Sequence, residues 1–128
     1  MSLKKRLATS LTALLLLFGG AIVVAPAASA SIGATVTCST GGVVGVYINK
    51  TAGTGASGWA TISPIGASTV SYYYSNIAST ASYYVSVGCG GSAGAWGTAS
   101  YGPTVSGNWD FVCYPGYVSG GYNRCYVP

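Results

Sequence analysis

The 128-residue sequence contains no histidine, its only acidic residue is Asp110, and charged residues make up 5% of it. General acid–base catalysis needs a group that changes protonation near neutral pH, usually histidine or one of a pair of carboxylates. Asp110 has no carboxylate partner, and a serine–lysine pair would depend on Lys50. We therefore expect a protein that is not an enzyme and that has no catalytic residue, no cofactor and no metal site.

Basic residues are also few, and three of the five, Lys4, Lys5 and Arg6, stand at the N-terminus. An apolar run over 11–24 follows them, and the small residues Ala28-Ser29-Ala30 come next. A basic start, an apolar run and a small-residue cleavage site are typical of a secretory signal peptide. The sequence thus predicts a signal peptide over 1–30 and a single secreted, extracellular β domain over 31–128.

Cleavage at this site leaves three charged residues, Lys50, Asp110 and Arg124, with a net charge of +1. Nucleic-acid phosphates require clustered positive charge, which two separated cations do not provide. The apolar run of the signal is too short to predict a membrane span. We expect neither nucleic acid nor a membrane span for the mature protein.

The four cysteines, Cys38, Cys89, Cys113 and Cys125, all follow the predicted signal. An even number of cysteines in a short exported chain predicts two disulfides. Of the three possible pairings we favour Cys38 with Cys89 and Cys113 with Cys125. Zinc is the alternative, but no two cysteines are separated by two residues and histidine is absent.

The pattern of residues after the signal predicts an all-β fold. Segments rich in Val, Ile, Thr, Tyr and Trp alternate with Gly, Ser and Pro, and no segment has helical periodicity with caps. Eight short strands indicate a small disulfide-stapled β-sandwich or a barrel. The strands are expected near 34–38, 43–48, 58–63, 69–75, 81–87, 94–100, 107–114 and 122–127.

An internal repeat of about 37 residues superposes several aromatic residues of the chain. Tyr47 then falls on Tyr84, Trp59 on Trp96, and Tyr72 on Trp109. The match favours two pseudo-repeated three-stranded units that close face to face. Chance agreement among the many Gly, Ser, Thr and Ala residues is the alternative.

Aromatic and small polar residues are the candidates for binding, because tyrosine provides a large, rigid contact area and a hydroxyl group. Tyr72, Tyr74 and Tyr84 are expected to pack in the core. The segment between Cys113 and Cys125 is either a recognition loop or an ordinary hairpin turn. The candidate binding residues are Tyr114, Tyr117, Tyr122 and Arg124 in this loop region, together with Trp59, Trp96 and Trp109.

Five segments between Gly58 and Tyr114 follow a distinctive order: Trp59, Ser71-Tyr72-Tyr73-Tyr74, Ala81-Ser82-Tyr83-Tyr84-Val85-Ser86-Val87, Ala93-Gly94-Ala95-Trp96-Gly97-Thr98-Ala99 and Trp109-Asp110-Phe111-Val112-Cys113-Tyr114. This order resembles the lactococcin 972 family of secreted bacteriocins. The resemblance implies a sandwich of two three-stranded sheets and an antibacterial role at the cell surface or in cell-wall synthesis. The histidines of that family are missing here, so any role they have in target binding is not carried over.

A second resemblance is to βγ-crystallin-like secreted proteins with two Greek keys. It rests on Tyr47 to Gly53 and on Tyr84 to Gly90. Both stretches are one residue shorter than the aromatic-to-glycine spacing of that family.

The sequence therefore predicts a secreted, non-catalytic binding protein, either a bacteriocin-like antibacterial factor or a subunit of a larger secreted toxin complex. Its expected partner is a protein or a bacterial cell-surface or cell-wall target. The alternatives are a glycan-binding or cell-wall-binding module, a protease inhibitor that presents residues 115–122, and a structural surface protein. The structural alternative rests on the uncharged windows 69–74 and 82–87, which are typical of cross-β assembly.

Overall fold

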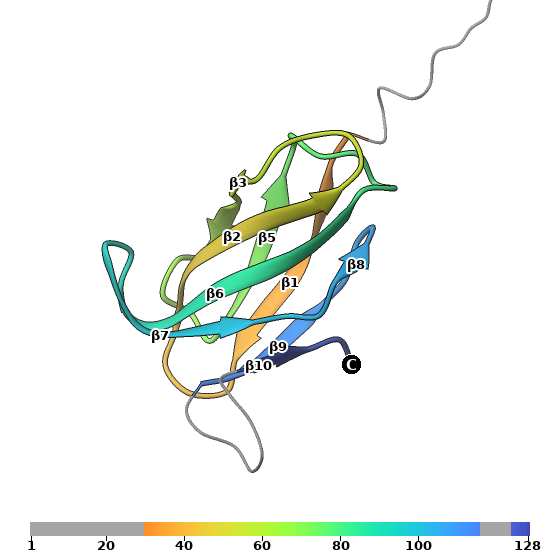
Figure 1. Cartoon of the computed structure of the whole chain (residues 1–128). Coiled ribbons are helices and arrows are strands. Elements are labelled where there is room, and N and C mark those ends of the chain that lie inside the picture. Colours follow the sequence, from red (N-terminus) through yellow and green to blue (C-terminus); the bar gives the residue numbers. More distant parts are fainter. Residues whose placement is uncertain (1–29, 116–123) are drawn as a thin grey trace, which may run out of the picture.

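The computed structural model describes residues 30–115 and 124–128, and this part of the chain forms strands and no helix (Figure 1). Within it, no helix has the length and apolarity needed to cross a membrane. The strands are β1 (Ile32–Cys38), β2 (Val43–Ala52), β3 (Gly58–Trp59), β4 (Thr61–Ser63), β5 (Thr69–Tyr74), β6 (Ser82–Ser92), β7 (Ala95–Tyr101), β8 (Val105–Ser106), β9 (Phe111–Tyr114) and β10 (Arg124–Tyr126).

The strands pair in a single path, β3-β2-β6-β7-β10-β9-β1-β5-β4, and β8 pairs with β6 beside it. The two ends of the path, β3 and β4, are neighbours in the chain and are separated only by Ala60. The sheet is therefore nearly closed. At Ala60 the chain passes directly from β3, at one end of the path, to β4, at the other end. Two pairings, β1 with β9 and β7 with β10, are parallel, and the others are antiparallel.

The core lies inside this sheet because the strands alternate inward and outward side chains. On β5, Tyr72 and Tyr74 are buried, whereas Tyr73 between them is 54% exposed. On β6, Tyr83 is fully buried, and Tyr84 is only partly buried. The expectation that Tyr72 and Tyr74 belong to the core is confirmed. The same expectation for Tyr84 is wrong, because the alternation of side chains along β6 turns Tyr83 toward the core instead.

The three buried tyrosines bind loop carbonyls with their hydroxyl groups, which satisfies polar atoms that burial removes from water. Tyr74 donates to the carbonyl of Ala56, Tyr72 donates to that of Trp109 over 2.7 Å, and Tyr83 donates to that of Gly107. Burial raises the pKa of the Tyr72 and Tyr83 hydroxyls above the usual value. Both side chains stay neutral and hold the segment before β9 against the core.

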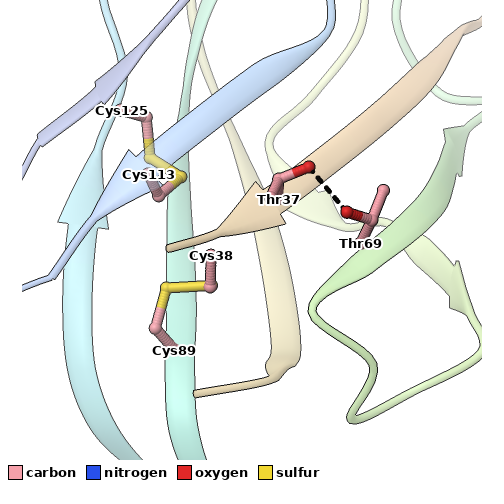
Figure 2. The surroundings of a disulfide bond; sticks show 6 residues. All are labelled: Thr37, Cys38, Thr69, Cys89, Cys113 and Cys125. Carbon is pink, nitrogen blue, oxygen red and sulfur yellow. Dashed lines mark hydrogen bonds between the residues drawn. A yellow bond between two sulfur atoms is a disulfide. The ribbon is translucent and has the colours of Figure 1, made fainter. Parts of the chain in front are cut away.

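Two disulfides join the strands, with the pairing that the sequence predicted (Figure 2). Cys38 at the end of β1 bonds to Cys89 of β6, and Cys113 of β9 bonds to Cys125 of β10. Beside them, the hydroxyls of Thr37 and Thr69 hydrogen-bond across β1 and β5 at 2.9 Å. The two disulfides are consistent with an extracellular or other oxidising environment.

The segment expected as a strand over 107–114 forms β9 only from Phe111 onward. Before it, the side chains of Asn108 and Asp110 accept hydrogen bonds from the backbone N–H groups of Gly33 and Thr35, at 3.0 and 3.1 Å. These side chains occupy the place that backbone carbonyls of a longer β9 would take beside β1. Asp110 Oδ1 also accepts a hydrogen bond from Thr35 Oγ1 at 2.9 Å.

The all-β class is confirmed, while the sandwich and the two three-stranded units stay predictions. The segment expected as one strand over 58–63 is divided at Ala60, where the chain leaves β2 and begins to pair with β5. The uncharged windows 69–74 and 82–87 correspond to β5 and to part of β6. Both strands have a paired neighbour on each side.

Candidate functional site

Three aromatic side chains contact one another on the outer side of β3, β2 and β7, and we call them the aromatic face: Tyr47, Trp59 and Trp96. The Trp59 ring lies 4.9 Å from the Tyr47 ring and 5.7 Å from the Trp96 ring, measured between centroids, and both contacts are edge-to-face. Trp59 is 61% exposed, and the other two are partly buried. The cluster thus holds a large aromatic surface open to solvent.

Two glycines make room for Trp96. Gly45 of β2 and Gly88 of β6 are register partners. A Cβ on Gly45 would lie 2.7 Å from Cζ2 of the indole, and a Cβ on Gly88 would lie 2.3 Å from its Cδ2. Since neither distance is possible for real atoms, the indole can pack on this part of the sheet only because both residues lack a side chain.

An apolar hollow adjoins the aromatic face. Its volume is about 290 Å³, and Trp59 forms part of its wall. Its floor and sides come from β2, from the segment around Ala60 and from the tip of the β6–β7 hairpin. The lining residues are Val44, Gly45, Val46, Trp59, Ala60, Ile62, Ile65 and Ala93.

Polar groups lie beside the aromatic residues on β2 and β6. The Asn49 amide donates to Ser86 Oγ at 2.8 Å and to the Tyr84 carbonyl at 3.3 Å. These bonds fix the amide and leave the Ser86 hydroxyl as a donor next to Tyr47, its register partner. An aromatic surface bordered by fixed hydroxyl and amide groups is suited to a ligand with both apolar and hydroxyl-bearing faces.

A second, larger hollow of about 550 Å³ lies between the end of β7 and β10. Tyr101 is 51% exposed at one side of it, and Tyr126 is 46% exposed at the other. The Tyr126 ring also lies 5.8 Å from that of Tyr114, between centroids. The hollow is lined by Tyr101, Gly102, Pro103, Arg124, Cys125, Tyr126 and Val127.

The three charged residues of the described part have different roles. Lys50 Nζ donates to the Gly53 carbonyl at 2.9 Å within its own turn, and Asp110 accepts hydrogen bonds from Thr35. Arg124 is exposed and contributes to the wall of the larger hollow. It is therefore the charged side chain placed to meet a ligand there.

The structure brings together only some of the residues that the sequence singled out. Trp59 and Trp96 are in contact, and Tyr114 and Arg124 are register partners. Trp109 is separate: it precedes β9, four strands from β2 along the sheet, and its indole N–H donates to the Ser106 carbonyl. Tyr117 and Tyr122 lie outside the described residues.

Three residues of these surfaces were not among the binding candidates predicted from the sequence: Tyr47, Tyr101 and Tyr126. Tyr47 had a signal, because the 37-residue offset aligns it with another tyrosine and the strand alternation turns it outward. Tyr101 and Tyr126 end up in one hollow only through the β7–β10 pairing, which local sequence does not encode.

Comparison of the chain with known proteins found no match to any family model, to any curated protein or to any solved structure.

Proposed function

We propose that this protein is a secreted, non-catalytic binding protein whose aromatic face binds a glycan of the bacterial cell wall. The observation that carries the proposal is the contact of exposed Trp59 with Tyr47 and Trp96 beside an apolar hollow. Sugar rings present apolar C–H faces that pack on aromatic rings, while their hydroxyls require polar partners at the edge. Ser86 provides such a partner next to Tyr47.

The apolar hollow favours a sugar with an N-acetyl group. Its lining consists of Gly45, of alanine, valine and isoleucine side chains and of Trp59, so it offers an apolar place for a methyl group. A sugar ring stacked on Trp59 would direct the methyl of its acetamido group into this hollow. The target we propose is therefore a glycan chain that contains N-acetylated sugars.

An antibacterial role, alone or as a subunit of a secreted toxin complex, would follow from binding at the cell wall, and the resemblance to secreted bacteriocins supports it. The two disulfides support secretion into an oxidising environment. Inhibition of bacterial growth by the purified protein tests this part of the proposal. Loss of the inhibition in Trp59→Ala would tie it to the aromatic face.

Binding is tested by calorimetric titration of the purified protein with chitohexaose and cellohexaose, which differ in the acetamido group. We expect chitohexaose to bind more tightly. Trp59→Ala should weaken this binding by about 2 kcal/mol, the scale of a central aromatic contact. Equal affinity for the two sugars contradicts the assignment of the hollow, and no binding of either contradicts a glycan site at the aromatic face.

Trp109→Ala is the matched control. Trp109 is 40% exposed, and it precedes β9, four strands from β2 along the sheet. Its removal takes away a comparable exposed aromatic surface and should leave chitohexaose binding unchanged. Far-ultraviolet circular dichroism of both variants checks that the sheet is intact.

A further inference from the structure

We infer that the glycan site extends from the aromatic face across the sheet to Arg124, and that its ligand is an acidic linear glycan. The inference rests on the proposed function and adds the charge and the length of the ligand. It comes from the strand register, which aligns the aromatic face and the larger hollow in one row.

Register pairing places one residue from each of six neighbouring strands in a continuous line, which we call the register row: Trp59, Tyr47, Ser86, Tyr101, Arg124 and Tyr114. Paired residues of neighbouring strands point to the same face of a sheet. Neighbouring strands are about 4.8 Å apart, so the row runs for about 24 Å over the outer surface. It curves with the nearly closed sheet, because it crosses six of the nine strands in the path, and a bound glycan must follow this curve. Figure 1 shows β2, β6 and β7 side by side along this path.

The register row is open to solvent along most of its length. Trp59, Tyr101 and Tyr114 are 61%, 51% and 43% exposed, and Arg124 is exposed as well. Tyr47 and Ser86 are partly buried in the middle. Aromatic rings thus recur along the row with a hydroxyl and a guanidinium between them, which suits a chain of several sugars.

The chemistry at Arg124 points to a carboxylate on that chain. In the row, Arg124 stands between Tyr101 and Tyr114, and it borders the 550 Å³ hollow. A guanidinium group binds a carboxylate through two parallel hydrogen bonds, and the neighbouring tyrosine rings provide surface for a sugar ring. A uronic acid combines both groups. The sequence has one acidic residue, Asp110, which is not in the row and is hydrogen-bonded to Thr35.

The test compares two forms of one ligand. Hyaluronan oligosaccharides are chains of N-acetylglucosamine and glucuronate, and their carboxyl methyl esters are the same chains without the negative charge. We expect the acidic form to bind about tenfold more tightly, the effect of one hydrogen-bonded charge. Arg124→Gln should remove this preference. Trp59→Ala should weaken the binding of both forms.

Lys50→Gln is the matched control for charge. It removes the same single positive charge, but Lys50 donates to Gly53 in a turn and is not in the register row. It should retain the tenfold preference, whereas a general effect of net charge would weaken acidic binding in both variants. Circular dichroism of Arg124→Gln verifies that the fold is kept.

Each outcome separates the inference from the proposed function. Equal binding of the acidic and esterified forms overturns the inference and leaves a neutral glycan site standing. Failure of both chitohexaose and cellohexaose to bind overturns the proposed function itself, and with it the inference that rests on it. Polyphosphate, which has no sugar rings, should not compete; competition as strong as that of hyaluronan would make Arg124 a general anion site and overturn the inference.

Discussion

Trp96 packs so closely on Gly88 that a Cβ there would lie 2.3 Å from Cδ2 of the indole. Gly88→Ala must therefore displace the Trp96 ring. We expect a loss of about 1 to 3 kcal/mol in the free energy of unfolding, the usual cost of overpacking, and weaker chitohexaose binding. Chemical denaturation and calorimetric titration measure the two effects.

Gly94→Ala is the control for this change. Gly94 lies in the β6–β7 hairpin tip, and a Cβ there would have no heavy atom within 4 Å. Stability and binding should both stay close to those of the unaltered protein. If Gly88→Ala behaved like Gly94→Ala, the packing of Trp96 on Gly88 would not matter for the site.

The two disulfides should contribute unequally to stability. Cys38 and Cys89 are 51 residues apart in sequence, whereas Cys113 and Cys125 are 12 apart. A cross-link that closes a longer loop removes more entropy from the unfolded chain, giving about 4 kcal/mol for the first and about 3 kcal/mol for the second. Denaturant unfolding of the two paired Cys→Ala variants compares them. A larger loss for the second pair would contradict the expected order.

Asp110 should stabilise β1 through its hydrogen bonds to Thr35. Asp110→Ala removes the acceptor for the Thr35 backbone N–H and hydroxyl, so we expect a loss of about 1 to 2 kcal/mol. Asp110→Asn keeps an oxygen acceptor and should lose less. Thermal and denaturant unfolding of both variants test this, and equal losses would show that the hydrogen bonds to Oδ1 are not the cause.

Alkaline pH should unfold the protein through its buried tyrosines. Burial raises the pKa of Tyr83 and Tyr72 above the usual 10.0. Below pH 10 these tyrosines do not lower the free energy of unfolding, because their hydroxyls are protonated in both the folded and the unfolded protein. Above it, the unfolded chain releases protons that the folded protein retains, so the free energy of unfolding falls.

Denaturant unfolding between pH 8 and pH 12 measures this dependence. Tyr83→Phe should reduce the steepness of the alkaline decline and cost about 1 kcal/mol at neutral pH through the lost hydrogen bond to Gly107. Tyr73→Phe removes an exposed hydroxyl and serves as the control. An unchanged decline in Tyr83→Phe would rule out its hydroxyl as the group responsible.

Local sequence predicted the strands well, since period-two alternation and β-branched residues act within a few residues of each other. Local sequence gave the wrong inward-facing residue on β6, where Tyr83 rather than Tyr84 is buried. Which of two alternating sets of side chains faces the core is decided only when the strand pairs with its neighbours. Local sequence also failed over 107–110, where Asn108 and Asp110 bind β1, which lies far away in the sequence.

The sequence singled out some residues of the candidate site but not their arrangement. Trp59 and Trp96 were named as candidate binding residues, and they are in contact on one face. Tyr101 was not among the candidates. It is placed beside Arg124 by a parallel pairing of β7 with β10, two strands that are far apart in the chain.

The sequence by itself determined the all-β class and the approximate positions of most strands, because both follow from interactions between near neighbours in the chain. The pairing of the cysteines was also favoured from the sequence, and the structure confirms it. Only the tertiary structure decided which aromatic side chains share one surface. The set of residues on that surface depends on strand register, which is set by packing of the whole core. It also depends on Ala60, where the chain stops pairing with β2 and starts to pair with β5.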